Sequence, residues 1–417
     1  MNVILLIIVL LLLQLLVACG DGTGLSNNQF GPFPTKDPLA ALAFNSDLLN
    51  PSPRFASYSN QSARASIIDP AAKIEVWGFQ ASGYEYGVPH VNFGGISLFS
   101  ETQVNVVTPS TNKKIDVIEH GHVAIGKTGI NYAFSNKVGN QIEIVRSLGN
   151  DQWQQDVFEI PWVNTQEEID LVELSSLTLM SFFSEDSNAL YIFNPLDGKY
   201  LKLRAAGNTM PLEIAGAFCE GNGNTSVNAI FRTILFDEIN SLFIAGDGQG
   251  ILTQIWLDNG CHDYTNSITH QLTNNEPILS INSMPSTDLA ITQSNNKLAF
   301  VNYSTTQFIT SSTSNTVCLL PVDSLSLDND LSLITCIPGG PNNYDIKRPF
   351  YQVFSQSLSN VILEINLDDS FSGVGVDINN MKLHRMLDSS LGILQTIDLT
   401  NGNIETNTGV FLSNLLN

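Results

Sequence analysis

The 417-residue chain is poor in basic residues and lacks the short motifs of several large protein classes. It has 18 Lys and Arg against 40 Asp and Glu, a formal net charge of −22, although only 14% of its residues are charged. A body this acidic is repelled by phosphate backbones, so we expect no nucleic-acid partner. No Cys-x-x-Cys pair occurs, which argues against a zinc ribbon or a thiol redox centre. The Gly-x-Ser-x-Gly elbow of many serine hydrolases is also absent.

The chain after residue 71 also lacks any long run with helical periodicity. It contains short apolar stretches, many of them alternating, which are separated by Asn, Gly, Asp and Ser. This pattern is typical of β-strands joined by tight turns. Because 43% of the residues are hydrophobic, the chain has ample material for a sizeable core. We therefore predict an all-β body.

One short unit recurs along this body: a strand, a turn containing Asn, and a strand of aliphatic and aromatic residues. The marker residues are Asn140, Asn188, Asn240, Asn296 and Asn360, with separations of 48, 52, 56 and 64 residues. A recurrence of roughly 50 residues with several strands per unit is typical of a β-propeller blade. Residues 71–417 divide best into seven blades, and six or eight also fit. Two β-sandwich domains are the competing interpretation, which the regular spacing disfavours.

Two turns support this fold by resemblance. Residues 188–207, with Asp197-Gly198 at their centre, resemble the YVTN-type propeller repeat, and residues 397–402, which end in Asn401-Gly402, are similar to its central turn. Asp-Gly and Asn-Gly suit tight hairpins because the central residues of a type I′ turn need positive φ. The resemblance implies a propeller and no particular activity.

The first nineteen residues contain an uncharged apolar run from Val3 to Ala18 and end in Leu16-Val17-Ala18-Cys19. The run is too short to span a bilayer, yet it matches the apolar core of a secretory signal. This segment resembles the lipobox of bacterial lipoproteins. The resemblance implies cleavage before Cys19, a thioether-linked diacylglycerol on its sulfur, and acylation of the new amino terminus. It also implies outer-membrane sorting, because Gly20 stands where an Asp favours inner-membrane retention.

These features divide the chain into three parts. Residues 1–18 are expected to form the signal peptide, residues 19–70 the lipidated cysteine with a Pro-rich tether, and residues 71–417 the propeller. A short helix over residues 38–44 would fit within the tether. Ring closure commonly joins strands from both termini, so residues 74–77 are expected to pair near the C-terminal strands.

Once Cys19 is assigned to lipid, an even number of cysteines remains. These are Cys219, Cys261, Cys318 and Cys336. An even remainder in an exported protein suggests two disulfides. Three pairings are possible, and we favour Cys219 with Cys261 and Cys318 with Cys336, because each then closes a loop within neighbouring hairpins. Free buried thiols are the alternative.

Few residues suggest chemistry. Glu119-His120-Gly121-His122 would place two imidazoles on one face of a strand, where they bind a metal only if another blade supplies a third ligand. Two histidines at this spacing more often line a strand surface. Asp247-Gly248-Gln249-Gly250 lacks the further acidic ligands and the following helix of a calcium or phosphate loop, so we expect a turn. We predict no metal and no cofactor.

The remaining candidates are acidic pairs and tryptophans. Asp328-Asn329-Asp330 and Asp368-Asp369 could form a weak calcium site, but such clusters in an acidic exported protein are usually solvated loops. Glu167-Glu168 is a pair of carboxylates that the sequence does not place across a pocket. The tryptophans are Trp77, Trp153, Trp162 and Trp256, which either stack on sugars or, more commonly, pack in or between blades. No catalytic set emerges.

We therefore expect a non-enzymatic, lipid-anchored envelope protein whose propeller binds a protein partner of unknown identity. Two alternatives remain open at this point. One is a lactonase or hydrolase with a metal in the central channel, and the other is a carbohydrate-binding propeller.

Overall fold

The computed structural model describes much of the chain between residues 54 and 411, and all structural statements below concern these residues. They are 54–59, 62–90, 94–126, 129–136, 140–149, 151–160, 179–184, 189–195, 198, 200–205, 212–214, 231–237, 240–257, 267–271, 278, 280–283, 289–294, 297–302, 307–311, 320–328, 330–337, 339–340, 343–344, 350–355, 360–366, 371–387 and 392–411. The signal peptide, Cys19, the tether up to residue 53 and the helix suggested over residues 38–44 lie outside the described residues.

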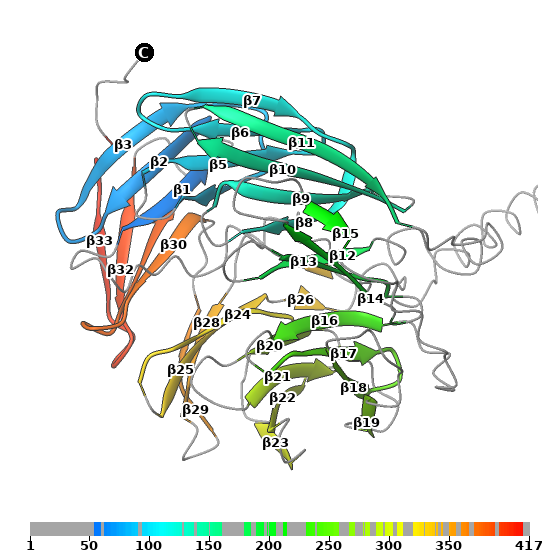
Figure 1. Ribbon diagram of the computed structural model, residues 1–417. Helices are drawn as coiled ribbons and strands as arrows, with labels where there is room; N and C mark the ends of the chain where they lie inside the picture. The colour runs from blue at the N-terminus through cyan, green and yellow to red at the C-terminus, as the bar shows by residue number, and fades with distance from the viewer. Residues whose placement is uncertain are drawn as a thin grey trace, which may run out of the picture.

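All described secondary structure is β, arranged as sheets around one axis (Figure 1). We number the sheets along the chain. Sheet 1 has three strands: β1 (Phe55–Ser59), β2 (Arg64–Asp69) and β3 (Ile74–Gln80). Sheet 2 contains β4 (Tyr86–Pro89), β5 (Ile96–Ser100), β6 (Gln103–Val107) and β7 (Asn112–Asp116). Sheet 3 contains β8 (His120–Ile125), β9 (Asn131–Asn136), β10 (Gln141–Gly149) and β11 (Gln152–Glu159).

The central part of the chain forms three further four-stranded sheets. Sheet 4 contains β12 (Met180–Phe183), β13 (Ala189–Phe193), β14 (Tyr200–Ala205) and β15 (Leu212–Ile214). Sheet 5 contains β16 (Phe231–Asp237), β17 (Leu242–Asp247), β18 (Ile251–Trp256) and β19 (Ser267–Gln271). Sheet 6 contains β20 (Ser280–Ser283), β21 (Leu289–Ser294), β22 (Lys297–Asn302) and β23 (Gln307–Ser311).

Two four-stranded sheets complete the ring. Sheet 7 contains β24 (Leu320–Ser326), β25 (Leu331–Ile337), β28 (Phe350–Ser355) and β29 (Asn360–Ile365), with a small hairpin of β26 (Gly339–Gly340) and β27 (Asn343–Tyr344) inserted between β25 and β28. Sheet 8 contains β30 (Phe371–Asp377), β31 (Lys382–Leu387), β32 (Leu394–Asp398) and β33 (Ile404–Asn407). All strand pairs in these sheets are antiparallel neighbours in sequence order, apart from the inserted hairpin.

The predicted all-β propeller is confirmed. Seven sheets have four strands, the number of blades favoured by chain length, and the three-stranded sheet 1 adds a further position to the ring. Strand β1 lies beside both β30 and β4, so sheet 1 fills the space between the last sheet and sheet 2. We call the contact between sheets 1 and 8 the closure seam.

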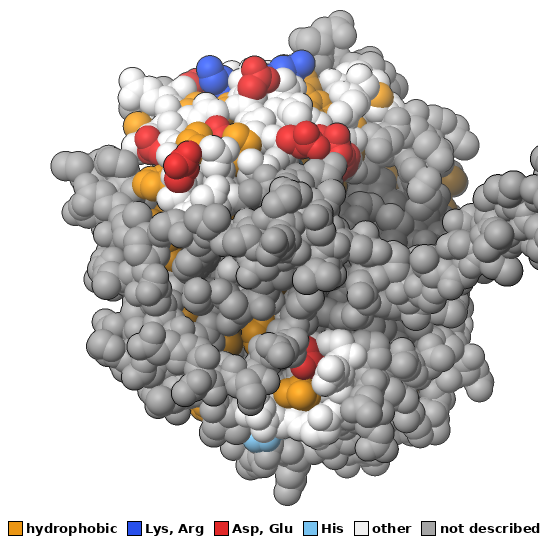
Figure 2. Space-filling model, turned by 90° about the vertical axis from the view of Figure 1, so that its right-hand side faces the viewer, with side chains coloured by type: hydrophobic (Ala, Val, Ile, Leu, Met, Phe, Trp, Pro, Cys, Tyr) orange, Lys and Arg blue, Asp and Glu red, His pale blue; other side chains and the backbone are white. Residues whose placement is uncertain are grey.

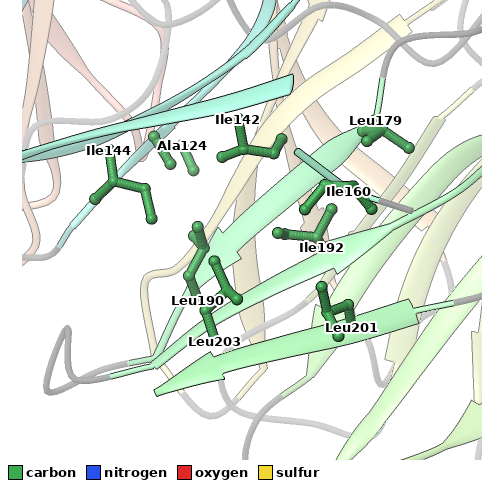
Figure 3. Close-up of a cluster of buried hydrophobic side chains, with 10 residues drawn as sticks. Ala124, Ile142, Ile144, Ile160, Leu179, Leu190, Ile192, Leu201 and Leu203 are labelled. Carbon is green, nitrogen blue, oxygen red and sulfur yellow. The ribbon is translucent and has the colours of Figure 1, made fainter. Parts of the chain in front are cut away.

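The core of the molecule lies between the sheets. Aliphatic side chains of sheet 3 pack against those of sheet 4 in one fully apolar cluster (Figure 3). Similar clusters join sheets 2 and 3, sheets 4 and 5, sheets 7 and 8, and sheets 1 and 2. A four-stranded sheet cannot bury both faces alone, and radial stacking supplies each face with a neighbour.

The ring begins earlier than the sequence suggested. Strands β1 and β2 lie within residues 19–70, which we had assigned to the tether. The tether prediction rests on turn-forming residues and on prolines, the last of which is Pro53, yet every residue of both strands is buried. The expected contact between the two termini is present, because the Glu75 amide of β3 donates to the Val410 carbonyl at 3.0 Å.

The marker asparagines do not occupy one structural place. Asn140 precedes the third strand of sheet 3, Asn240 precedes the second strand of sheet 5, and Asn360 begins the fourth strand of sheet 7. Asn188 and Asn296 lie outside the described residues. The markers therefore record hairpin turns rather than a strict repeat, since a meander of short strands needs a turn after each strand.

One of these turns recurs in detail. The Asn240 side-chain amide donates to the Asp237 carboxylate at 2.8 Å, and Asn380 makes the same bond to Asp377 at 2.7 Å. The next residue in each case has positive φ, 53° at Ser241 and 51° at Met381. This Asp-x-x-Asn turn joins the first and second strands of sheets 5 and 8.

The two turns of the YVTN-like segments are also alike. Gly198 has a φ of 73° and its amide donates to the Asn194 carbonyl at 2.8 Å. Gly402 has a φ of 77° and donates to the Asp398 carbonyl, also at 2.8 Å. Both are hairpin turns, as predicted. They join the second and third strands of sheet 4 and the third and fourth strands of sheet 8, so the likeness is one of turn chemistry.

Two glycines of β30 allow the backbones at the closure seam to meet. A Cβ on Gly373 would lie closer than 3.0 Å to backbone atoms of Ala56 and Ser57, and one on Gly375 would meet the Phe55 side chain. Because a backbone cannot move aside as a side chain can, we expect Gly373→Ala to lower the free energy of unfolding by about 1–3 kcal/mol. Urea unfolding midpoints would measure this effect.

The matched control is Gly94→Ala, since a Cβ on Gly94 meets no atom within 4 Å. We expect a change below about 0.5 kcal/mol there. Equal effects of the two variants would contradict a close backbone contact at the closure seam.

Candidate functional site

The two histidines of the predicted pair lie on opposite faces of sheet 3, so the expectation of a shared face is wrong. The β8–β9 register shifts between His120 and His122, which marks a β-bulge at Gly121. The His120 ring packs on Phe134 at 4.9 Å, within the contact to sheet 2, and His122 faces sheet 4. The extra residue of a bulge reverses the alternation that the sequence argument assumed.

His122 is buried between sheets 3 and 4. Its Nδ1 accepts the Ser181 amide at 3.3 Å, and its ring lies 6.0 Å from that of Phe182. Burial lowers the pKa of His122 to about 3, with a smaller effect from His120. The imidazole is therefore neutral at physiological pH and acts as a hydrogen-bond acceptor between two blades.

The closest approach to a catalytic arrangement lies between sheets 2 and 3. The Ser97 hydroxyl is 2.8 Å from His90 Nε2 and 2.5 Å from the Tyr132 hydroxyl. Ser97 and Tyr132 also reach the Gly129 carbonyl, at 3.1 and 2.9 Å. A serine beside an imidazole resembles a nucleophile with its base. No sequence pattern predicts this cluster, since its members come from separate turns and strands of two sheets.

Burial decides against nucleophilic chemistry in this cluster. Ser97 and Tyr132 are both 0% exposed, so a substrate has no route to the hydroxyl in this arrangement. Desolvation lowers the pKa of His90 to about 4 and raises that of Tyr132, so both side chains stay neutral. The cluster instead satisfies polar groups that hold sheet 2 against sheet 3.

We expect Tyr132→Phe to lower the free energy of unfolding by about 1–3 kcal/mol, because it removes the two hydrogen bonds of a buried hydroxyl, to Ser97 and to the Gly129 carbonyl. Tyr84→Phe is the control, since the Tyr84 hydroxyl makes a longer 3.3 Å bond to partly buried Gln103. Urea unfolding of both variants would compare the losses. Labelling of Ser97 in the folded protein by a fluorophosphonate probe would contradict this structural role.

The predicted acidic loops are turns where the structure describes them. Asp247 Oδ1 accepts the amides of Gln249 and Ile251 at 2.8 and 2.9 Å. Asp328 Oδ1 accepts the amides of Asp330 and Leu331, both at 2.7 Å. Both confirm the expected turns between strands. The pairs at residues 167–168 and 368–369 lie outside the described residues.

Three tryptophans pack against buried clusters, as the commoner expectation had it. Trp77 contacts the cluster between sheets 1 and 2, Trp153 the cluster between sheets 2 and 3, and Trp256 a cluster of sheets 5 and 6. Trp162 lies outside the described residues. A sugar-stacking surface therefore finds no support in these three side chains.

The disulfide prediction is not tested. Cys219, Cys261 and Cys318 lie outside the described residues, and Cys336 is described only as a backbone position in β25, opposite Pro321 and Phe350. Over the described part of the chain, no group of three or more His, Cys, Asp or Glu residues is placed to hold a metal ion. The same residues include no helix long and apolar enough to cross a membrane.

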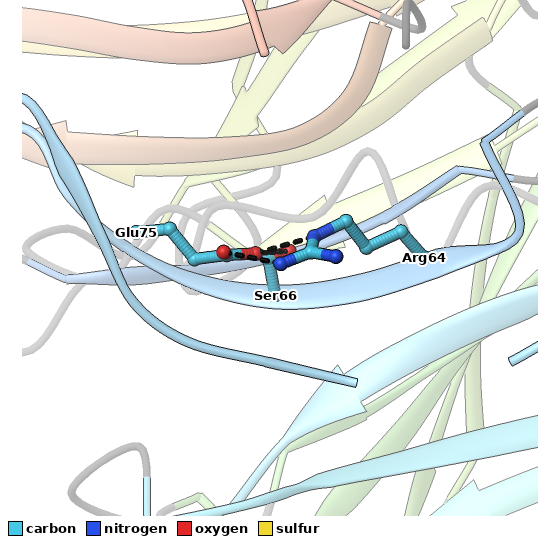
Figure 4. A network of polar contacts seen from close by, with 3 residues as sticks. All are labelled: Arg64, Ser66 and Glu75. Carbon is cyan, nitrogen blue, oxygen red and sulfur yellow. Dashed lines mark hydrogen bonds and ion pairs between the residues drawn. The ribbon is translucent and has the colours of Figure 1, made fainter. Parts of the chain in front are cut away.

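Sheet 1 contains the most strongly ionic buried contact that the structure describes (Figure 4). Arg64 Nε and Nη2 donate to the two oxygens of Glu75 at 2.7 and 2.5 Å, and the Ser66 hydroxyl donates to the same carboxylate. Glu75 is 1% exposed. Gly78 makes room for this pair, because a Cβ there would collide with the Glu75 carboxylate and the Arg64 guanidinium.

Residues 409–411, which we call the strap, cross from sheet 8 to this pair. The Val410 amide donates to the Gly392 carbonyl, and the Val410 carbonyl accepts the Glu75 amide, both at 3.0 Å. The Phe411 ring lies 5.3 Å from the Arg64 guanidinium carbon. Beside the strap, exposed Lys73 pairs with Glu405 of β33 at 2.6 Å. The strap thus joins the two ends of the propeller.

Strand β3 is the outer strand of sheet 1, and its outer edge is open as far as the described residues show, since none of the described strands pairs with it there. The Ala81 amide donates to the Ala63 carbonyl at 2.7 Å. In an antiparallel pair, alternate residues face the partner strand, so the main-chain groups of Gly78 and Gln80 face away from β2. Ile74 and Val76 are 45% and 40% exposed on the same strand.

This edge carries less charge than the outer strand of sheet 2. Strand β7 exposes Lys113, Lys114 and Asp116, side chains of the kind that guard an edge against further pairing. The single charged residue of β3 is Glu75, which is turned inward to Arg64. A different face of the molecule, the right-hand side of Figure 1, is acidic in places: Figure 2 shows Asp and Glu side chains across its upper part, with Lys or Arg at its upper rim.

Comparison with known proteins supports the fold alone. No protein-family model matches the sequence, and no curated protein sequence matches it. The chain is similar in structure to the dihydro-heme d1 dehydrogenase NirN in complex with DHE, with a TM-score of 0.60, 11% identity, and coverage of 88% of this chain and 74% of that one. It is also similar to apo AztD from Citrobacter koseri, with a TM-score of 0.53, 10% identity, and coverage of 85% and 94%.

Proposed function

We propose that this protein is a lipid-anchored component of the bacterial envelope, held at the outer membrane through Cys19, and that its propeller binds a protein partner. The proposed membrane location rests on the lipobox-like sequence that ends at Cys19. Two or three acyl chains anchor a protein stably, whereas one holds it weakly.

The open edge of β3 is the observation that carries the binding role. Its exposed apolar side chains can pack against another polypeptide, and its outward main-chain groups can hydrogen-bond to one. The polar clusters between the blades are buried and have no exposed surface for a partner. Exposed, uncharged edge strands are sites of protein association. No cofactor takes part in this proposal, and the net charge of −22 disfavours nucleic acid.

The distance between the anchor and the ring suits such a role. Residues 20–53 separate Cys19 from the first described residue, and five of them are proline. An extended Pro-rich segment of this length reaches on the order of 100 Å. The propeller therefore has room to meet a partner away from the lipid surface.

The anchor is tested by Cys19→Ala. We expect the unaltered protein to sediment with membranes and to incorporate an alkyne-labelled fatty acid, and the variant to lose both properties and to keep its signal peptide. Cys219→Ala is the matched control and retains the label. If Cys19→Ala stays labelled, lipid is attached elsewhere and the anchor is wrong.

A further inference from the structure

We propose that the open edge of β3 binds an extended, non-acidic strand of a partner protein, which adds to sheet 1 as its fourth strand. This inference rests on the proposed function and specifies its surface and its mode. Main-chain hydrogen bonds give such strand addition its affinity, and side-chain contacts give it selectivity.

In the described part of the chain every other sheet of the ring has four strands and sheet 1 has three, so none of the described strands takes the fourth place at its outer side. Main-chain pairing already occurs at one end of this edge. The bond from the Glu75 amide to the Val410 carbonyl shows that this edge accepts main-chain pairing at its first position.

The strap does not follow the edge further. The Phe411 ring lies over Arg64, whose side chain is on the face of sheet 1 that meets sheet 8. The outward main-chain groups of Gly78 and Gln80 come later along β3. The main-chain amides and carbonyls of these two residues are therefore the groups to which an added strand would hydrogen-bond.

Charge selects the kind of partner. A second copy of this chain has the same formal net charge of −22, and the repulsion between the two acidic molecules opposes self-association. The edge itself is neutral, since Glu75 is paired with Arg64, and exposed Ile74 and Val76 favour apolar side chains opposite them. A neutral or basic strand with alternating apolar residues meets these conditions.

The experiment uses the full-length lipidated protein in cells, with a photo-crosslinking amino acid in place of Val76. Gln80→Pro removes the outward amide of β3 and leaves the pairing with β2 intact, because the Gln80 amide faces away from β2. We expect it to reduce the crosslinked adduct at least about tenfold. Gln80→Ala, which changes only the side chain, leaves the adduct unchanged.

A second control introduces proline at an outward-facing position of β7, the outer strand with exposed charged side chains. The Val117 amide donates to the Thr102 carbonyl at 2.9 Å, so the Lys114 amide faces outward from β7. Lys114→Pro is therefore expected to leave the adduct unchanged. In the purified adduct, slowed hydrogen exchange of the Gly78 and Gln80 amides would show the added strand directly.

Three results would overturn the proposal. They are an adduct that Gln80→Pro does not reduce, an adduct formed with a differently tagged copy of this chain, and an adduct mapped by mass spectrometry to residues 412–417 of the same molecule. Probes at Val157 and Ile362, which are 54% and 47% exposed on other sheets, distinguish a failure of the β3 site from a failure of the protein-binding role as a whole. Adducts there alone keep a protein-binding role and reject this edge, whereas no adduct anywhere rejects both.

Discussion

Replacement of Arg64 by alanine is expected to lower the free energy of unfolding by about 3–5 kcal/mol, the largest loss that we predict for one substitution. Arg64 holds both oxygens of the Glu75 carboxylate, at 2.7 and 2.5 Å. The variant leaves that carboxylate, which is 1% exposed, without its counter-ion. Urea unfolding midpoints followed by tryptophan fluorescence would measure the loss, since Trp77 lies on the same sheet.

The chain supplies its own control for this prediction. Lys73 and Glu405 form an ion pair of the same type at the same seam, yet both side chains are exposed. We expect Lys73→Ala to cost less than about 1 kcal/mol. A double variant, Arg64→Met with Glu75→Leu, should recover most of the loss, because it removes both buried charges together. Similar losses for Arg64→Ala and Lys73→Ala would refute a buried ionic role.

The second large effect is a loss of stability in mild acid. Desolvation is the main cause that lowers the folded-state pKa of His122 to about 3 and those of His90 and His384 to about 4. The unfolded chain binds protons on these rings near pH 6.5, the folded protein does so only at lower pH, and stability therefore falls as the pH drops from 6.5 towards 4. One unit of pKa difference corresponds to about 1.4 kcal/mol, so His122 alone contributes a loss of about 3 kcal/mol.

Thermal unfolding measured between pH 7.5 and pH 4 would test this. His122→Gln keeps an acceptor for the Ser181 amide and cannot take a proton in this range. Its unfolding temperature is expected to be lower than that of the unaltered protein at pH 7.5 and to fall less steeply with acid. Parallel curves for the two proteins would show that His122 is not responsible.

The fold was predictable because it depends on local rules. Short alternating strands and turn residues define a meander, and a meander of this length must stack its sheets to bury both faces. The marker asparagines led to the right fold although Asn140, Asn240 and Asn360 belong to different turns. The spacing of these asparagines reflects how often turns occur along the chain. It does not mark the same position in each blade.

Features that depend on distant residues were not predictable. The bulge at Gly121 separated His120 from His122, and no pattern in the sequence announces an extra residue in one strand. The burial of Arg64 and Ser66 was not predictable, because their partner, Glu75, becomes evident only once β2 and β3 pair. The cluster of His90, Ser97 and Tyr132 needs two sheets in contact before it exists.

The closure seam has a consequence for how the molecule is made. A ribosome delivers β1 first, yet its neighbour β30 begins only at Phe371, and the strap follows later still. Contacts this far apart in sequence form slowly, and until they form the apolar face of sheet 1 that meets sheet 8 stays uncovered and prone to aggregation. The earliest strands to be synthesised are thus the last to be enclosed, and we expect them to be the segment that proteases and holding chaperones reach in the newly made chain.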